Sequence, residues 1–529
     1  MDIIPIYIIF IPILTSIIIY ILNNKYINYL IFVSQSIVTI LCLLYYSTFD
    51  ENTVKTLVLG GWSKEIGIAL KNDYLSLAFV LLTIFMWWIV IIFCWNKRKQ
   101  DYKFLFFLIF LEGTFLGLLQ TNDLFNLFVF IEITTVLSSI LILYKKDGHS
   151  VRAGLYYLLF NSVGMILYLI GLIFVYNLSG TLNMDIISER IMPLRNMDSV
   201  RLSYIFIMAA IGVKSAFFPL YNWLPKAHSA APSSISALLS GLLVKSGLYA
   251  FIRLNAMYGI DEFKEFFFLL GFFTALSGIV FAVSQKDIKQ ILAFHTISQI
   301  GIILMGLSSF YGKTFYGGVF HILNHALFKA LLFMGAGIII NTYGARRISE
   351  LRGVFKRLPF TSILMITGML AITGAPFLNG FISKTIIKYG LSESLFKTYM
   401  FYILNLGTSV SFVKFSQIFF GKSKVNKYDA YSEIIAMLLL GLACLSIGIF
   451  FVPIAKTLFY IDLEFIRFSN LSIWANYFVT LIIAYFIYLL IISKDFWIIK
   501  KIRHIHISFG ASNFLLVLFV FIMIMWKYI

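Results

Sequence analysis

Several charged and titratable side chains lie inside stretches of sequence that are otherwise apolar. A charge at mid-bilayer is costly, so such residues face the protein interior and often mark ion paths. The apolar runs hold Glu112, Glu132, Lys214, Lys245, Lys329, Lys384, Lys414, His295, His321 and His325. Carboxylates, amines and imidazoles exchange protons, and these types together favour proton transfer through a membrane.

Glu132 and Lys214 are predicted to be the centre of this chemistry. Glu132 lies about nine residues past the outer end of its run, near the bilayer centre at about 1.5 Å per residue. Lys214 lies equally deep and precedes Pro219, which breaks the helix and needs protein or water around its freed carbonyls. We expect a hydrated pair whose separation sets proton affinity. A static ion pair, or a neutral Glu132 bonded to a nearby Ser or Thr, is the alternative.

The segment HILNHALFKALLF places His321, His325 and Lys329 at helical spacings of four residues. This spacing stacks the three side chains on one helical face and predicts a proton relay. Two histidines at this spacing also suit a metal, but no third acidic or thiol ligand accompanies them. Lys245, flanked by Ser and Gly in LLVKSGLYAF, is predicted to be a further proton station.

A second helix break follows the pattern of the first. In TGAPFLNGFISK, Gly374, Pro376 and Gly380 precede Lys384, as Lys214 accompanies Pro219. Paired interruptions in two halves of a chain indicate an inverted repeat of the transporter kind. Two other intramembrane charges receive no place in the path. Lys414 lies close enough to a basic loop to snorkel, and Glu112 is left unassigned.

The composition identifies the class of protein. Of 529 residues, 60% are hydrophobic and 12% charged, whereas soluble domains carry about 25% charged residues. Runs near 20 residues predict an all-α polytopic membrane protein, and their continuous apolar character excludes a β-barrel. The net charge of +18 is assigned to loop lysine and arginine, not to nucleic-acid binding. The three cysteines lie in apolar runs, so neither disulfides nor metal or iron–sulfur sites are expected.

Hydropathy predicts about 16 spans between residues 3 and 528, the first of them a permanent span and not a cleaved signal. The loops between spans alternate between the two sides of the membrane and so form two sets. One set holds about 23 Lys and Arg and the other about 14. The richer set includes the basic residues at 97–99, 145–146, 345–357, 422–427 and 500–501. This richer set is assigned to the cytoplasm, which places the N-terminus outside the cell membrane of a prokaryote. Lys226 and His228 are assigned to a cytoplasmic-side loop. Segment 49–73 is expected to form a hairpin, and 494–508 an interfacial helix.

The sequence resembles a known family in several specific motifs. VKSAFFPLYNWLPKAHSAAPSSISALLSGLLVKSGLYAFIR, SQKDIKQILAFHTISQIGIILMG and FHILNHALFKALLFMGAG are similar to the antiporter-like subunits of respiratory complex I, membrane-bound hydrogenases and Mrp-type antiporters. The similarity spans at least residues 74–420. GGWSKEIGIALKNDYLSLAFVLL and NDLFNLFVFIEI most resemble the D-type subunit of Mrp antiporters and its hydrogenase counterparts.

The resemblance implies a fold of about 14 core helices with two inverted five-helix repeats. It divides the chain into N-terminal helices (1–95), repeats at 103–256 and 264–420, and C-terminal helices (432–529) that include two spans beyond the core. It also carries over proton-path roles to Glu132, Lys214, Lys245, His325 and Lys384, and implies no bound cofactor. Glu112, the extra spans, and a 494–508 segment too short for a long lateral helix depart from the family's pattern.

The leading hypothesis is a proton-translocating subunit of a multisubunit Na⁺/H⁺ antiporter, close to the D-type subunit of the Mrp antiporters. Its partners would be other integral membrane subunits, protons, the lipid bilayer and, as an open question, sodium. A membrane-arm subunit of a complex I-like oxidoreductase or hydrogenase ranks second. A non-conducting scaffold is the alternative of a different class. No catalytic residue, redox centre or metal site is predicted in this chain.

Overall fold

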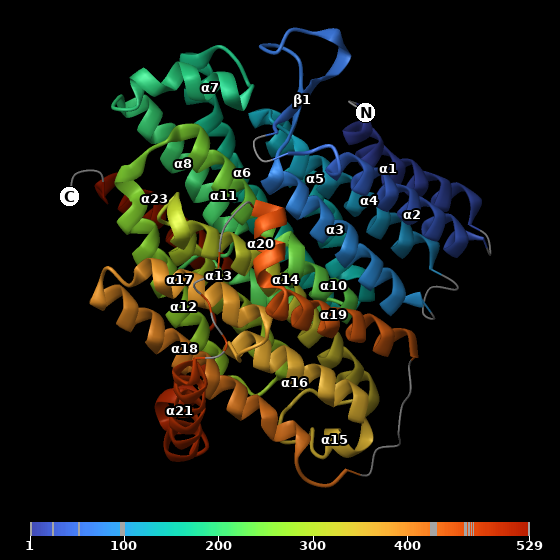
Figure 1. Cartoon of the computed structure of the whole chain (residues 1–529), viewed down its shortest axis with the longest axis vertical. Helices are drawn as coiled ribbons and strands as arrows, with labels where there is room; N and C mark the ends of the chain where they lie inside the picture. The colour runs from blue at the N-terminus through green and yellow to red at the C-terminus, as the bar shows by residue number, and fades with distance from the viewer. Residues whose placement is uncertain are drawn as a thin grey trace.

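The computed structural model describes residues 3–23, 26–50, 53–95, 101–423, 431–459, 463, 466, 468 and 470–526. Two groups of basic residues used to orient the chain, 97–99 and 424–427, lie outside the described residues. The chain is an all-α polytopic membrane protein, as predicted (Figure 1). Its helices are α1 (Ile4–Leu22), α2 (Ile27–Tyr46), α3 (Tyr74–Phe93), α4 (Tyr102–Gln120), α5 (Leu124–Ile142), α6 (Gly148–Ser179), α7 (Met184–Ile191), α8 (Asp198–Lys214), α9 (Trp223–Ala230), α10 (Ser233–Leu238), α11 (Lys245–Tyr258), α12 (Lys264–Ser284), α13 (Ile288–Leu307), α14 (Gly312–Tyr343), α15 (Val354–Arg357), α16 (Pro359–Thr373), α17 (Asn379–Leu391), α18 (Leu395–Phe415), α19 (Tyr431–Ile449), α20 (Phe451–Phe459), α21 (Leu471–Ile487), α22 (Trp497–Arg503) and α23 (Phe509–Trp526).

Thirteen helical segments of the described chain are long and apolar enough to cross a membrane. Each corresponds to one predicted span. The other three predicted spans contain α8, the pair α16 and α17, and α18. In the first two of these, a break divides the apolar run, so no single helix reaches the length that a crossing needs.

Several helices begin at an aspartate. In each case the aspartate side chain accepts a hydrogen bond from a backbone N–H of the first turn. The helices are α3 (Asp73), α4 (Asp101), α5 (Asp123), α6 (Asp147) and α13 (Asp287). The carboxylate satisfies an N–H that has no partner within the helix and complements the positive end of the helix dipole. These caps fix where each helix starts at the membrane surface.

Helix α14 lies at the centre of the bundle (Figure 1). It packs against α13, α16, α17, α19 and α10, and every residue from Gly317 to Ile339 is buried. It is one unbroken helix of 32 residues. Because its surroundings are protein on all sides, its polar residues can exist at membrane depth without contact with lipid.

The two breaks predicted from sequence are present. Helix α8 ends at Lys214, and the chain is irregular until α9 starts at Trp223. Helix α16 ends where Gly374 adopts a left-handed conformation with φ +84°, and α17 starts at Asn379. A third interruption was not predicted: residues Leu239–Leu243 form a π-helical turn between α10 and α11. Such turns widen the helix locally and are frequent at functional sites.

The hairpin expected in segment 49–73 is confirmed. Strands β1 (Lys55–Val58) and β2 (Ala69–Asn72) pair antiparallel, and Gly60 and Gly61 take positive φ values of 74° and 71° at the turn. Only glycine adopts this conformation without strain, which explains the GG pair. A short helix, α22, occurs within the predicted interfacial segment 494–508 and has no buried residues.

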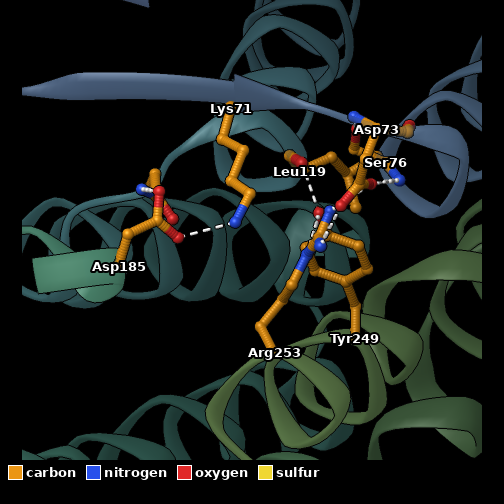
Figure 2. A network of polar contacts seen from close by, with 8 residues as sticks. Lys71, Asp73, Ser76, Leu119, Asp185, Tyr249 and Arg253 are labelled. Carbon is orange, nitrogen blue, oxygen red and sulfur yellow. Dashed lines mark hydrogen bonds and ion pairs between the residues drawn. The ribbon is translucent and has the colours of Figure 1, made fainter. Parts of the chain in front are cut away.

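A polar network ties the hairpin to the helices beneath it (Figure 2). Arg253 of α11 donates two hydrogen bonds to the Asp73 carboxylate, at 2.5 and 2.7 Å, and a third to Tyr249 Oη at 3.0 Å. Tyr249 in turn donates to the Leu119 carbonyl at 2.5 Å, while Lys71 of β2 forms an ion pair with Asp185 of α7 at 2.6 Å. A bidentate arginine–carboxylate pair is both strong and directional, so this network holds α3 and α11 in register.

The Asp73→Asn substitution is expected to destabilise the chain by about 2 kcal/mol above pH 4. Burial raises the pKa of the Asp73 carboxyl, but Arg253, the Ser76 N–H and Lys71 outweigh burial and lower the pKa from 3.8 to about 2. Since the folded-state pKa is depressed, this stabilisation is complete above the ordinary pKa and disappears as the pH falls towards 2. Thermal unfolding of the purified complex from pH 7 downward measures the difference between wild type and variant.

Asp261→Asn is the matched control for this substitution. Asp261 forms an ion pair with Lys264, but its side chain is 64% exposed. Exposed pairs contribute only about 0–1 kcal/mol, so this variant should unfold near the wild-type temperature. A wild-type unfolding temperature for Asp73→Asn at neutral pH would contradict the role assigned to the network.

Candidate functional site

Lys214 lies at the C-terminal end of α8, where the break begins, and is 3% exposed. Its ammonium group donates to Thr135 Oγ1 of α5 at 2.5 Å and to the Tyr157 hydroxyl of α6 at 3.3 Å. The break itself is closed by the Trp223 indole N–H, which donates to the Val213 carbonyl at 2.9 Å. The lysine is therefore held by neutral hydroxyl groups between three helices.

Glu132 was predicted to pair with Lys214, but the structure shows no contact between the two side chains. Its Oε2 accepts a hydrogen bond from Ser162 of α6 at 3.3 Å, and its Oε1 is buried without a hydrogen-bond partner. Among the described ion pairs none joins Glu132 to Lys214. The sequence predicted a hydrated pair of these two residues; in this structure the Lys214 ammonium group contacts Thr135 and Tyr157 instead. A carboxyl bonded to a nearby serine is the alternative that the sequence had left open.

The two residues nevertheless remain on adjacent surfaces. Glu132 and Thr135 are three residues apart on α5, which places them one turn apart on the same helical face. Because Thr135 contacts Lys214 directly, Glu132 lies one helical turn from a side chain that holds the ammonium group.

Lys245 is positioned by the π-helical turn. It is the first residue of α11, is 1% exposed, and donates to the Ser240 carbonyl within that turn. The Ser240 hydroxyl also bonds to Thr296 Oγ1 of α13 at 2.8 Å. Next to Lys245, a Cβ added at Gly247 would lie 2.3 Å from Ser215 Oγ. This close approach places the start of α11 directly against the break after Lys214.

The two histidines of α14 have different surroundings. His321 Nδ1 is hydrogen-bonded to Ser383 Oγ of α17 at 2.8 Å, and its Nε2 to Gln299 Oε1 of α13 at 3.0 Å. His325 is fully buried, and neither of its ring nitrogens has a hydrogen-bond partner. The centroids of the two rings are 6.4 Å apart and the rings are stacked. A buried imidazole without partners suits a site where water or a proton is exchanged.

Lys329 and Lys384 both donate to backbone carbonyls. Lys329 contacts the Leu292 carbonyl of α13 at 2.5 Å, and Lys384 contacts the Ile372 carbonyl at the end of α16 at 2.7 Å. The His325 ring interacts electrostatically with three lysines, Lys245, Lys329 and Lys384. The structure therefore brings together the predicted residues of α11, α14 and α17.

Helix breaks explain two of these lysine contacts. The π-helical turn and the end of α16 leave carbonyl groups without the usual helical donor, and Lys245 and Lys384 supply one. Pro219 and Pro376 lie in the segments that interrupt α8–α9 and α16–α17, as predicted. The side-chain amides of Asn324 and Asn379 each donate to the other residue's backbone carbonyl, at 2.8 and 3.3 Å, and so fix α14 to the first turn of α17.

Several polar residues of this site were not identified from the sequence. These residues are Gln299, Ser383, Asn324 and Asn379. Each interrupts an apolar run close to a titratable residue, and this pattern could have identified them. His228 was assigned to a loop, but it lies in α9, is fully buried and stacks on Phe333 at 4.5 Å. Nearly all residues of the short helix α9 are buried. Hydropathy does not reveal this, because the helix is short and partly polar.

Two intramembrane charges lie apart from this set. Glu112 of α4 accepts a hydrogen bond from Gln35 of α2 at 2.8 Å, within the N-terminal helices. Lys414 of α18 donates to the carbonyls of Val283 and Gln285, at the end of α12. No group of three or more His, Cys, Asp or Glu residues suited to a metal occurs among the described residues.

Comparison with known proteins gives consistent matches. A family model described as NADH:quinone oxidoreductase/Mrp antiporter, transmembrane, matches residues 121–412. The D-type subunit of the Na⁺/H⁺ antiporter of Alkalihalophilus pseudofirmus is 30% identical over 398 residues, which cover 74% of this chain and 81% of that protein. The N-type subunit of the NADH-quinone oxidoreductase of Desulforudis audaxviator is 32% identical over 349 residues, 64% of this chain and 69% of that protein.

Solved structures of similar fold come from two membrane complexes. A chain of the membrane-bound sulfane sulfur reductase, an archaeal respiratory complex, superposes with a TM-score of 0.80 at 26% identity. A chain of the Mrp complex from Dietzia sp. DQ12-45-1b gives a TM-score of 0.80 at 20% identity, which shows likeness of fold alone. Both alignments cover 86% of this chain and 96% of the other.

Proposed function

The chain belongs to the NADH:quinone oxidoreductase/Mrp antiporter family, and from this premise we propose that it translocates protons as a membrane subunit of a multisubunit cation/proton antiporter. The observation that supports the proposal best is a row of titratable groups on adjoining helices, of which Glu132 is half-buried and the others are buried. The row consists of Glu132, Lys214, Lys245, His325, His321, Lys329 and Lys384.

The geometry of the row suits stepwise proton movement. Its lysines contact hydroxyl and carbonyl oxygens, which stabilise an ammonium group without fixing a counter-charge beside it. A lysine so held can release its proton, whereas a lysine paired with a carboxylate is more firmly charged. In the proposed sequence, protons enter at Glu132, pass Lys214 and Lys245, and reach the histidines and Lys384.

Residues 103–256 and 264–420 are proposed to be the two inverted repeats of this path. Each contains an interrupted span with a lysine at the interruption, Lys214 in the first and Lys384 in the second. The N-terminus is proposed to lie outside the cell membrane, on the basis of the loop charges. Sodium as the exchanged ion, and further integral membrane subunits as partners, are proposed from the named relatives.

A membrane-arm subunit of a respiratory complex is the second candidate. It is favoured by the similarity to the NADH-quinone oxidoreductase of Desulforudis audaxviator and by the respiratory complex that shares the fold. The antiporter ranks first, because the Na⁺/H⁺ antiporter relatives of the D type align over a larger share of this chain.

Glu132→Gln in the whole complex tests the proposal. In inside-out vesicles, sodium-dependent formation or dissipation of a pH gradient is expected to fall at least about tenfold, since the amide keeps the size of the side chain but carries no proton to transfer. Glu112→Gln, a carboxyl at similar depth on the neighbouring helix, should retain the rate within about twofold, because it lies outside the row.

Two results would count against the proposal. Wild-type rates in an assembled Glu132→Gln complex would leave this chain as a scaffold. A gradient that requires a respiratory electron donor and is indifferent to sodium would favour the oxidoreductase candidate.

A further inference from the structure

A large apolar groove lies between α16, α18 and α21, away from the row of titratable groups. Its cavity volume is about 810 Å³, within the roughly 300–1,000 Å³ typical of small-molecule sites. Its apolar lining includes Met369 and Leu370 of α16, Phe412 and Val413 of α18, and Leu481 of α21. A cavity with such a lining does not hold ordered water well and favours an apolar occupant.

The groove lies beside a helix at the periphery of the bundle. Helix α21 packs along α18 and projects from the bundle, as Figure 1 shows at its lower end. Ala484 is the one buried residue within α21, and most of the other side chains of this helix are exposed. A second cavity of about 390 Å³ continues the groove past Leu370 and Tyr477 towards the break at Pro376.

One end of the groove is cationic. Lys356 of α15 and Lys422, which follows α18, both line the cavity and both are exposed. Hydrogen bonds between backbone groups and arginine side chains hold these two segments together. Gly353 N–H donates to the Phe420 carbonyl at 2.9 Å, and Arg357 donates to the Ser423 carbonyl at 2.6 Å. The two segments that carry the lysines are thus held together at this end of the groove.

We propose that this groove binds an anionic phospholipid, with its phosphate at Lys356 and Lys422 and an acyl chain along α16 and α18. The distribution of charge in the groove matches that of the ligand, which is anionic at one end and apolar over the rest. Basic pockets between transmembrane helices are a recognised way to bind such head groups. A helix of another subunit would fill the apolar part but would leave the paired cations without a counter-charge.

One aromatic ring separates the groove from a buried histidine, His295, that lies outside the row. Phe412 lines the groove on one side, and its ring centroid lies 4.7 Å from that of the buried His295. Thr373, which is hydrogen-bonded to Tyr477 at 3.0 Å, directly follows Ile372, whose carbonyl holds Lys384. A bound acyl chain therefore packs against the wall of the second break.

Native mass spectrometry of the whole delipidated complex, re-exposed to vesicles, tests the site. The wild-type complex should retain phosphatidylglycerol in preference to phosphatidylcholine. Lys356→Glu/Lys422→Glu should lower phosphatidylglycerol retention at least about fivefold, since the phosphate then meets two carboxylates. Val413→Trp should lower it similarly by filling the groove. The control pair Lys103→Glu/Lys146→Glu removes two exposed lysines elsewhere and should retain the lipid.

Three outcomes would overturn the proposal. These are equal retention of the two lipids, undiminished phosphatidylglycerol in the Lys356/Lys422 variant, and crosslinking from position 413 to another protein of the complex in place of lipid. Both lysines are exposed, so their substitution leaves the packed core unchanged and the complex assembled. The readout is lipid retention and not transport, so failure here is distinct from failure of the proposed function.

Discussion

Complexes that carry Lys214→Arg are expected to lose sodium-dependent pH-gradient activity at least about tenfold, although the positive charge is kept. Arginine does not release its proton in proteins, so it can hold the Thr135 and Tyr157 hydroxyls but cannot relay a proton. Lys214→Ala is expected to lose as much activity, because it removes the ammonium group altogether. Vesicles that contain the whole complex, with assembly checked by native electrophoresis, provide the measurement.

The arginine variant separates the two interpretations of Lys214. A static cation that fixes helix packing would be replaced adequately by arginine, and transport would then survive in Lys214→Arg but not in Lys214→Ala. Lys414→Arg is the matched control. Lys414 of α18 is also held by neutral oxygens, the carbonyls of Val283 and Gln285 at the end of α12, but it lies outside the row. Its activity should stay within about twofold of wild type. Full activity of assembled Lys214→Arg would refute the role of Lys214 as a proton station.

Gly380→Ala is expected to reduce transport about tenfold or to prevent assembly, although it adds a single methyl group. Gly380 lies in the first turn of α17, and a Cβ at this position would be 1.9 Å from the Ala371 carbonyl oxygen. The obstacle is backbone, so α17 must move away from α16. Lys384, one turn further along α17, would then separate from the Ile372 carbonyl that it contacts at 2.7 Å.

Gly510→Ala serves as the control for this substitution. Gly510 lies in α23, and a Cβ there has no atom within 4 Å. That variant should assemble and transport as the wild type does. Thermal unfolding of the assembled complexes gives a second readout, with a loss of about 1–3 kcal/mol expected for Gly380→Ala. Unchanged stability and transport in Gly380→Ala would show that the α16–α17 contact does not position Lys384.

The sequence by itself determined the membrane-spanning character of the chain and predicted the depth of its charged residues. Both follow from local properties, since hydropathy over about 20 residues reports a span and the rise per residue reports depth. Pro219 and Pro376 likewise revealed the two breaks, because proline disrupts a helix whatever surrounds it. The Gly-Gly pair predicted the hairpin for the same kind of reason.

Tertiary structure alone decided which groups meet. Lys214 contacts Thr135 and not Glu132. Lys245 and Lys384 contact backbone carbonyls at helix interruptions. The interruption beside Lys245 is a π-helical turn that contains no proline, so the sequence did not predict it. His321 and His325 share a helical face, yet only His321 has hydrogen-bond partners, since those come from α13 and α17. Such contacts depend on how distant helices pack, and a spacing along one helix carries no information about them.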